Sequence, residues 1–376
     1  MKLKIIWLII IIFFTGCELD TYNKMENRYT EDIITKEAER NVTKDVNNSV
    51  IKKEITKGSL VNEDNDTSIV DSNLTDLKEK KILILDNDAY DPDYMPLLLS
   101  AIHENRWGLV NVGLVIITEQ GVSNKTNMLY RSILEEFKSD IPLTIAHNTS
   151  DRVFRSKLTN NLENYTDIIY DDVVEDAITV LENKLESKDD KTVSYAIGGK
   201  LIFLSKFLSD PERLELFKLK VKEVIYALGC NPRDRSCSRD FNLAATNKAY
   251  SATKDVYSKL HGKIPFVVID DKRGRVRSLD MFKSAKIPLM NHLLGTNIYG
   301  TYGDHHAGDV EILFAKSRKD NFNSYRCNVA LIDKSFKANS INKSGNDYIL
   351  INKDISINGL TSAIYDSLIY RWRIEQ

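Results

Sequence analysis

The chain has 376 residues, with 52 lysines and arginines against 54 aspartates and glutamates, so its formal net charge at pH 7 is only −2. This balance gives no electrostatic basis for binding nucleic acid, which requires concentrated positive charge. The length leaves room for one large α/β domain with a sizeable core and for segments outside it.

The first 16 residues have the composition of a signal peptide. Two lysines precede an unbroken apolar run over residues 5–14, and a Thr-Gly-Cys sequence ending in Cys17 follows directly. The run is shorter than the about 20 residues of a transmembrane helix, and the small residues before Cys17 resemble a bacterial lipobox, although Phe14 stands where an aliphatic residue is usual. We expect residues 1–16 to be removed and Cys17 to carry acyl chains such as palmitate, which anchor the protein on the non-cytoplasmic side of a cell membrane or outer membrane. The alternative is an uncleaved anchor helix.

The segment from residue 17 to residue 79 differs in composition from the rest of the chain. It is rich in Asn, Asp, Glu, Lys, Ser and Thr, has no tryptophan, and shows no apolar periodicity that persists. Such a segment cannot bury enough apolar surface to offset its chain entropy. We therefore predict a disordered tether over residues 17–79, which lets a domain spanning residues 80–376 stand away from the bilayer.

Beyond residue 80, short apolar runs alternate with stretches of helical spacing. The runs are apolar at successive positions, as expected of parallel strands that helices cover on both faces. This alternation predicts an α/β domain with a mostly parallel open sheet and helices on both faces, in which ligands bind at the carboxyl ends of the strands. The predicted strands are 81–86, 112–118, 142–146, 192–197, 223–228 and 264–270, and the predicted helices are 124–137, 172–185, 201–208 and 278–294.

Four aspartates follow the first predicted strand, in the sequence Asp86-Asn-Asp-Ala-Tyr-Asp-Pro-Asp93. Carboxylates this close repel one another unless a cation or a set of hydrogen-bond donors lies among them, and hard cations such as Ca²⁺ take about six to eight oxygen ligands. The alternative is an Asp-rich turn that caps a helix beginning near Tyr94, because aspartate is a favoured N-cap. The pattern by itself leaves both interpretations open.

The Asp86-Asn-Asp88 sequence, with Asp93 after it, resembles the first motif of the inosine-uridine nucleoside hydrolase family. Five further segments resemble motifs of that family and follow in the same order along the domain. They are Thr118-Glu-Gln-Gly121, Ala196-Ile-Gly-Gly-Lys200, Leu228-Gly-Cys-Asn231, Arg239-Asp-Phe-Asn-Leu243 and the segment from His306 to Ala315. Six matches in the right order mark the domain as similar to a nucleoside hydrolase.

The resemblance implies hydrolysis of the N-glycosidic bonds of ribonucleosides, with a calcium-bound water as the nucleophile. Asp88, Asp93 and Asp309 would bind the Ca²⁺ through their carboxylates, and Ile197 would bind it through its backbone carbonyl. The ion would also bind the 2′- and 3′-hydroxyls of the ribose. Metal binding lowers the pKa of a water, and Asp88 would take its proton as the general base.

The same resemblance assigns roles to four more residues. Asp86 would orient the first motif, and Asp240 and Asn242 would hydrogen-bond the sugar, as suits a pocket that recognises hydroxyls. His306 would protonate the leaving base, because histidine has the appropriate pKa range; its alternative is a surface position in a loop. The implied partner is a nucleoside or a related ribosyl compound, and a homo-oligomer is left open.

Two departures from the family keep a second function open. Where the family has two adjacent aspartates, direct alignment gives Pro92-Asp93 and a one-residue shift gives Asp93-Tyr94, so one carboxylate is missing either way. Asp240 is shorter by a methylene than the family's glutamate. A weakened calcium site would leave a non-catalytic protein that binds nucleosides or sugars on the same fold. Phosphoryl-transfer families also have an Asp-rich strand end, but they need separate Thr and Lys motifs, and no lysine motif is evident at a strand end.

Besides Cys17, the chain contains Cys230, Cys237 and Cys327. An exported protein can keep disulfides, and Cys230 and Cys237 flank one short loop, so a bridge between them is one interpretation. Three free thiols are the other. The spacing lacks the paired pattern of a zinc site.

Overall fold

A computed structural model of the chain describes residues 81–88, 94–118, 124–149, 176–228, 230–231, 236–238, 243, 246–270, 275–277, 304–306, 310–317, 322–332, 335–341 and 345–352. All of them belong to one compact unit that spans Val70–Gln376. The predicted signal peptide, Cys17 and the predicted tether lie outside the described residues. Among the helices that are described, none is long and apolar enough to cross a membrane.

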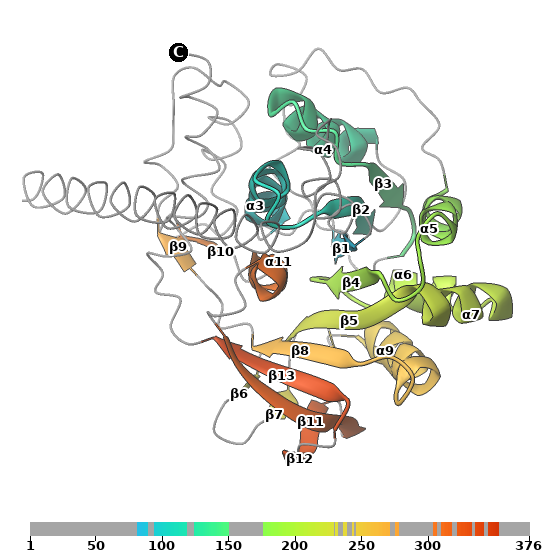
Figure 1. Cartoon of the computed structure of the whole chain (residues 1–376). Helices are drawn as coiled ribbons and strands as arrows, with labels where there is room; N and C mark the ends of the chain where they lie inside the picture. Colours follow the sequence, from blue (N-terminus) through green and yellow to red (C-terminus); the bar gives the residue numbers. More distant parts are fainter. Residues whose placement is uncertain are drawn as a thin grey trace, which may run out of the picture. The chain divides into compact units, whose positions relative to one another are not determined.

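The described strands form an 11-stranded sheet and a separate two-stranded sheet (Figure 1). The large sheet begins with neighbouring strands that all run parallel and continues from β13 with strands that run antiparallel to their neighbours. In order across the sheet, the parallel strands are β3 (Leu143–Ala146), β2 (Val112–Thr118), β1 (Ile82–Asp88), β4 (Val193–Ile197), β5 (Val221–Leu228), β8 (Phe266–Asp270) and β13 (Asp347–Asn352). The strands that follow are β11 (Phe322–Ile332), β12 (Ser335–Ile341), β7 (Ser236–Ser238) and β6 (Cys230–Asn231), and the small sheet pairs β9 (Arg275–Arg277) with β10 (Asp304–His306).

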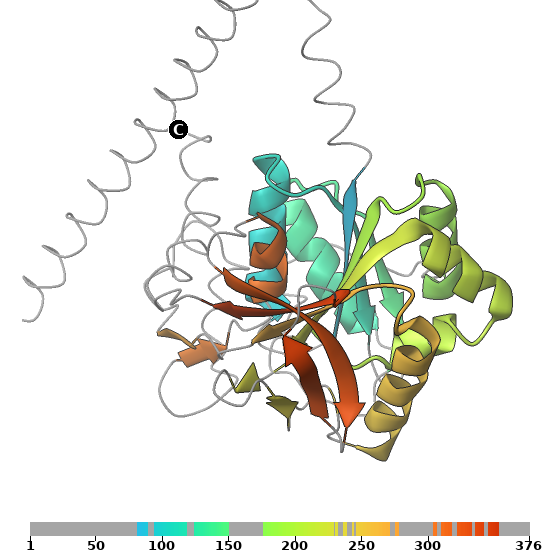
Figure 2. The ribbon, with the colours of Figure 1, turned by 60° about the horizontal axis from the view of Figure 1, so that its bottom comes forward.

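Helices cover both faces of the parallel strands (Figure 2). One face carries α3 (Tyr94–Arg106), α4 (Asn124–Glu136) and α11 (Val310–Ser317), and the other carries α5 (Ala177–Glu186), α6 (Ile202–Phe207), α7 (Pro211–Lys220) and α9 (Asn247–Leu260). Leu83 and Leu85 of β1 belong to the first core, whereas Ile82 and Ile84 belong to the second. Because successive residues of a strand point to opposite faces, β1 is buried along its whole length.

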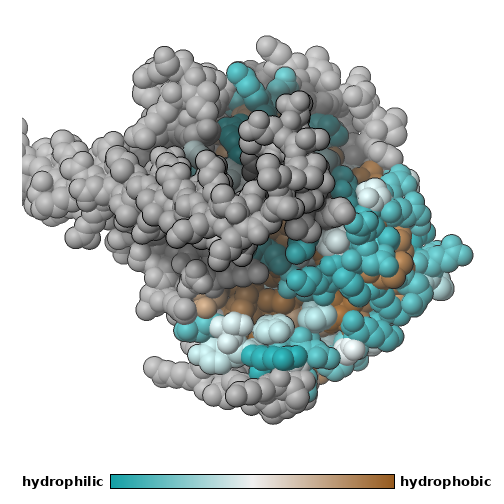
Figure 3. Space-filling view, in the orientation of Figure 1, coloured by the Kyte–Doolittle hydropathy of each residue, from teal (hydrophilic) through white to brown (hydrophobic). Residues whose placement is uncertain are grey.

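The outer surface of the second helical layer contrasts with the buried strands. In Figure 3 the surface over α5, α7 and α9 is largely hydrophilic, with few apolar patches. The start of α7 is fixed locally: Asp210 accepts hydrogen bonds from the backbone N–H of Glu212 at 2.9 Å and of Arg213 at 3.2 Å, and Pro211 occupies the first helical position. Such caps satisfy N–H groups that have no partner within the helix.

The predicted fold class is confirmed, and so are the six predicted strands. They correspond to β1, β2, β3, β4, β5 and β8, with ends that differ by two residues or fewer. Three predicted helices correspond to α4, α5 and α6. The fourth, over residues 278–294, lies outside the described residues.

The antiparallel part of the sheet was not predicted. In β11 the side chains of residues 323–326 are exposed, and alternation of buried and exposed positions begins only at Cys327. Short or half-exposed strands lack the continuous apolar runs by which the buried parallel strands are recognised. Pairing with β13 and β12 holds β11 in the sheet, and Tyr257 of α9 donates to the carbonyl of Val329 and packs against Phe336 of β12. These contacts join segments far apart in the chain, so the local sequence does not reveal them.

The order of the strands places a switch point beside β1. From β1 the chain builds β2 and β3 on one side and then returns to place β4 on the other. At such a point the connections leave the carboxyl ends of the two strands in opposite directions, which opens a crevice there. The carboxyl ends of β1 and β4 are therefore the place where this fold provides a binding site.

Asp347 holds the junction between the parallel and antiparallel parts of the sheet. Its buried carboxylate accepts a hydrogen bond from the backbone N–H of Phe266 in β8 at 2.9 Å, and another from the N–H of Val329 in β11 at 2.9 Å. Each carboxylate oxygen thus satisfies a backbone donor of a strand adjacent to β13.

We expect Asp347→Ala to lower the free energy of unfolding by about 2–5 kcal/mol, because two buried N–H groups lose their acceptor. Urea denaturation measures this change. Asp347→Asn is the matched control: its amide keeps one acceptor oxygen, so its loss should be clearly smaller. An Asp347→Ala variant as stable as the wild type would contradict the role assigned to this carboxylate.

Candidate active site

Two aspartates of the first motif stand at the carboxyl end of β1. Asp86 lies opposite Ile197, the last residue of β4, and Asp88 lies opposite Thr118, the last residue of β2. The backbone N–H of Gly198 donates to the carbonyl of Asp86 at 2.9 Å, which extends the pairing of β1 with β4 by one residue. The structure thereby brings together three residues that the sequence assigned to the site: Asp86, Asp88 and Ile197.

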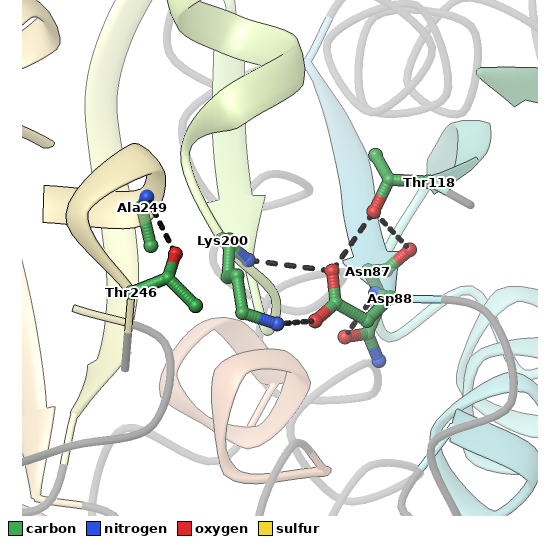
Figure 4. Close-up of polar contacts among 6 residues, drawn as sticks. All are labelled: Asn87, Asp88, Thr118, Lys200, Thr246 and Ala249. Atoms are coloured by element: carbon green, nitrogen blue, oxygen red, sulfur yellow. Dashed lines mark hydrogen bonds and ion pairs between the residues drawn. The ribbon is translucent and has the colours of Figure 1, made fainter. Parts of the chain in front are cut away.

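The carboxylate of Asp88 is surrounded by donors from both neighbouring strands (Figure 4). The ammonium of Lys200, just after β4, lies 3.0 Å from Oδ2. The hydroxyl of Thr118 donates to Oδ1 at 3.0 Å, and the backbone N–H of Lys200 lies 3.4 Å from the same oxygen. The backbone N–H of Asp88 donates to Oδ1 of Asn87 at 2.9 Å. These contacts fix the carboxylate at the switch point.

Gly199 allows the chain after β4 to approach Asp88 this closely. A Cβ at this position would lie 2.6 Å from Oδ1 of Asp88 and 2.8 Å from its backbone nitrogen. Contacts this short force something to shift, and one of the two atoms belongs to the backbone. Residue 199 is therefore glycine because the turn packs directly against the aspartate.

Lys200 is buried to an unusual degree for a lysine, with its side chain only 1% exposed. Lysines are almost never fully buried unless they are paired, and an unpaired ammonium in a protein interior costs several kcal/mol of desolvation. The ion pair with Asp88 offsets that cost. The other lysine ion pairs of the described residues are more open, with lysine side chains 16–24% exposed.

Asp86 is enclosed more completely than Asp88. The hydroxyl of Tyr195 donates to its Oδ2 at 2.7 Å, and Oδ1 has no hydrogen-bond partner among the described residues. Burial raises the pKa of Asp86 to about 8; the hydrogen bond from Tyr195 opposes the rise, and the charge of Asp88 adds to it. Asp86 therefore carries a proton at neutral pH, and Asp88 is the carboxylate that Lys200 neutralises.

Asp88 keeps a limited capacity for one further partner. Two carboxylate oxygens offer about four acceptor positions, and Lys200 and Thr118 supply three donors to them. The side chain is 9% exposed. Asp88 can therefore accept a hydrogen bond from one water or hydroxyl that reaches the end of β1.

The described residues do not fit a Ca²⁺ at Asp88. They include no cluster of three or more His, Cys, Asp or Glu side chains able to hold a metal, whereas Ca²⁺ takes about six to eight oxygen ligands at about 2.3–2.6 Å. An ion on Oδ2 of Asp88 would lie within about 6 Å of the Lys200 ammonium. At about 6 Å a divalent ion and an ammonium repel by about 5 kcal/mol, even at an effective dielectric constant of about 20.

The remaining predicted site residues are not placed by the structure. Asp93, Asp240, Asn242 and Asp309 lie outside the described residues. The backbone of His306 belongs to β10, where it pairs with Arg275 of β9, but its side chain is not described. The roles assigned to these five residues stay predictions.

The cysteines are described only in part. Cys327 is buried and free, and burial raises the pKa of its thiol to about 11. Cys230 and Cys237 are directly opposite each other in the antiparallel pairing of β6 with β7, but their side chains are not described. Such backbone pairing is compatible with the predicted bridge and does not test it.

Sequence reasoning did not find Lys200 and Tyr195 as site residues. Lys200 does lie in one of the recognised motifs. It is a charged residue between the buried Ile197 and the apolar start of α6, and this position was a signal that it belongs to the site. Tyr195 gave no signal, because a tyrosine inside a buried strand is read as core. Only the pairing of β1 with β4 shows that it faces Asp86.

The absence of a lysine motif was one ground for setting phosphoryl transfer aside, and on this point the sequence analysis was wrong. Lys200 does follow a strand end, and with Thr118 it contacts Asp88. A nucleophilic carboxylate, however, needs an accessible oxygen. Asp86 is 1% exposed and protonated at neutral pH, and Asp88, whose side chain is 9% exposed, has room for only one small partner such as a water. The geometry therefore does not favour phosphoryl transfer.

No protein-family model matches the sequence, and no curated protein matches it. Solved structures do match. An inosine-uridine preferring nucleoside hydrolase from Bacillus anthracis has a TM-score of 0.53 at 13% identity, with 76% of this chain and 99% of that chain covered. A plant nucleoside hydrolase has a TM-score of 0.54 at 14% identity, with 77% and 99% covered. The type III effector protein XopQ, complexed with adenosine diphosphate ribose, has a TM-score of 0.53 at 12% identity, with 79% and 97% covered.

These similarities show the fold. The domain has the fold of the nucleoside hydrolases and spans nearly the whole length of the matched structures. At such low identity the fold alone is shared, so what the domain does follows from its own residues.

The raised pKa of Asp86 makes the stability of the domain depend on pH. Between pH 3.8, its ordinary pKa, and about 8, the folded state keeps a proton that the unfolded state releases. Stability therefore falls as the pH rises through this window, by on the order of a few kcal/mol in total. Below pH 3.8 both the folded and the unfolded state hold the proton, so Asp86 causes no loss of stability there.

We expect Asp86→Asn to remove this slope, because its amide is neutral throughout. Its free energy of unfolding, relative to the wild type, should increase steadily from pH 5 to pH 8.5 in urea titrations. Asp190→Asn, at a carboxylate that is 57% exposed, is the control and should run parallel to the wild type. Parallel profiles for Asp86→Asn as well would exclude a buried, protonated Asp86.

Proposed function

We propose that the domain hydrolyses the N-glycosidic bond of a ribosyl compound at the carboxyl ends of β1 and β4. The observation that carries this proposal is the carboxylate of Asp88, which is fixed by Lys200 and Thr118 at the switch point and retains one acceptor position. The shared fold with nucleoside hydrolases supports the same reaction class.

In the proposed reaction, a water bound to Asp88 attacks the anomeric carbon of the ribose. The bond between carbon and oxygen forms as the bond between carbon and the base nitrogen breaks. Asp88 takes the proton of the water, and the departing nitrogen takes a proton from a donor, for which the sequence offers His306. Thr118 and Lys200 hold Asp88 in position, and positioning of this kind is a large part of general base catalysis.

The proposed substrates are nucleosides and related ribosyl compounds. Asp240 and Asn242 are the residues that the sequence assigns to the sugar, and their polar side chains suit ribose hydroxyls. Because XopQ was solved with adenosine diphosphate ribose, that compound belongs in a substrate panel beside purine and pyrimidine nucleosides. The small net charge gives no reason to include nucleic acid. A homo-oligomer stays open.

Calcium is the part of the sequence prediction that this proposal leaves out. The family resemblance implies Ca²⁺ on Asp88, Asp93, Asp309 and the carbonyl of Ile197. Two of these residues lie outside the described part of the chain, and a Ca²⁺ on Asp88 would have to displace the ammonium of Lys200. The proposed water is therefore activated by the carboxylate alone.

We expect Asp88→Asn to reduce ribose release by at least about 100-fold, the contribution of a general base. Release of reducing sugar from the nucleoside panel measures the effect, and circular dichroism checks the fold. Asp190→Asn serves as the surface control. A wild-type protein that binds nucleosides without cleaving them would support the binding alternative, and cleavage of a phosphate monoester in place of the nucleosides would support phosphoryl transfer.

We further propose that the protein is exported and anchored by acyl chains on Cys17, with residues 17–79 as the tether. The support is the order of basic, apolar and small residues before that cysteine. Several acyl chains bury enough CH₂ groups for a stable anchor.

Cells that express the wild type and are fed labelled palmitate should show a labelled protein in the membrane fraction. Cys17→Ser should abolish the label, whereas Cys327→Ser, at a thiol that is buried in the domain, should retain it. A label that persists in Cys17→Ser would refute the lipid anchor.

A further inference from the structure

We propose that Lys200 is the resident cation of this site: its ammonium takes the place beside Asp88 that a divalent metal would need, and the site therefore binds no Ca²⁺ at Asp88. The inference deepens the proposed function and rests on it for the reaction that the site performs. The cation itself can be tested without turnover.

The first argument is the way in which Lys200 is held. Its backbone N–H and its ammonium both reach the same carboxylate, the first at 3.4 Å from Oδ1 and the second at 3.0 Å from Oδ2. Gly199 lets the turn that carries it pack directly against Asp88, since a Cβ there would lie 2.6 Å from Oδ1 of Asp88. The lysine is thus part of the turn after β4 and not a mobile side chain that happens to reach the site (Figure 4).

The second argument is the balance of charge. Among the described residues, the ammonium of Lys200 lies 3.0 Å from Oδ2 of Asp88, and the lysine side chain is only 1% exposed. A divalent ion on the same carboxylate would add two positive charges beside a buried ammonium. A buried excess of charge is strongly unfavourable.

The third argument comes from the sequence. In the motif that resembles the nucleoside hydrolases, one of two adjacent aspartates is missing, whether Pro92 or, after a one-residue shift, Tyr94 stands in its place. The loss of an acidic ligand reduces the affinity for a metal, and so does the buried ammonium of Lys200 beside Asp88. Two changes at different positions thus point to the same result.

The test is a titration of the full chain with CaCl₂ at constant ionic strength. Calorimetry measures the heat of binding, and thermal unfolding measures the melting temperature. We expect no saturable heat that depends on Asp88, and a melting temperature that Ca²⁺ leaves unchanged. Ca²⁺ binding to the wild type that disappears in Asp88→Asn would overturn the proposal. Because this comparison uses the wild type and one conservative variant, it does not depend on whether Lys200 variants fold.

Lys200→Met gives the complementary test, since it keeps the length of the side chain and removes its charge. We expect this variant to bind Ca²⁺ at least about tenfold more tightly than the wild type, seen as a rise in melting temperature with added Ca²⁺. The double variant Lys200→Met, Asp88→Asn should not show this gain. Lys259→Met is the control, because Lys259 forms an ion pair of 2.8 Å with Asp255 on the surface of α9. A gain in Lys259→Met equal to that in Lys200→Met would count against the role of Lys200.

A chelator separates this inference from the proposed function. Ribose release that continues in excess EDTA supports both, and release that EDTA abolishes and Ca²⁺ restores supports hydrolysis while overturning the resident lysine. If no substrate is cleaved and no Asp88-dependent Ca²⁺ binding is found, the hydrolase fails and the lysine cation stands.

Discussion

The ion pair between Lys200 and Asp88 joins the carboxyl ends of two central strands, and the rest of the site is arranged around it. Removing both charges from water costs several kcal/mol for each ion, and the attraction between them repays this only where further donors complete the geometry. Thr118 and the backbone N–H of Lys200 supply those donors. Gly199 removes the side chain that would keep the two strand ends apart.

The two helical layers bury the strands that carry this ion pair, and burial makes the charges of the site strongly dependent on their neighbours. Because the described helices cover both faces of β1, every residue of the strand is buried. In such surroundings an acid without a cation beside it holds its proton, as Asp86 does against Tyr195. Among the described residues, the two aspartates of this motif have different partners: Asp88 faces an ammonium, and Asp86 faces a tyrosine hydroxyl. The motif works as one neutral acid and one compensated carboxylate.

Six of the parallel strands and the helices α4, α5 and α6 could be predicted because their sequence signal is local. Buried strands such as β2 are continuous apolar runs, and these can be recognised without knowledge of their neighbours. The strands beyond β13 escaped recognition because they are stabilised by pairing with distant segments, as Asp347 illustrates by joining β8 and β11. Among the site residues, Asp86, Asp88 and Ile197 could be found because they stand in motifs at strand ends. Their partners, Tyr195 for Asp86 and Lys200 for Asp88, could not be found in this way.

By itself, then, the sequence determined that six parallel strands form, that Asp86 and Asp88 stand at the end of the first of them, and that a polar site lies there. The tertiary structure decided the chemistry of that site. A sequence shows a lysine 112 residues after an aspartate, but not that the two meet, because their contact depends on β4 pairing with β1 across the switch point. The same pairing sets the protonation of Asp86, since burial and charge are properties of the folded surroundings and not of the residue.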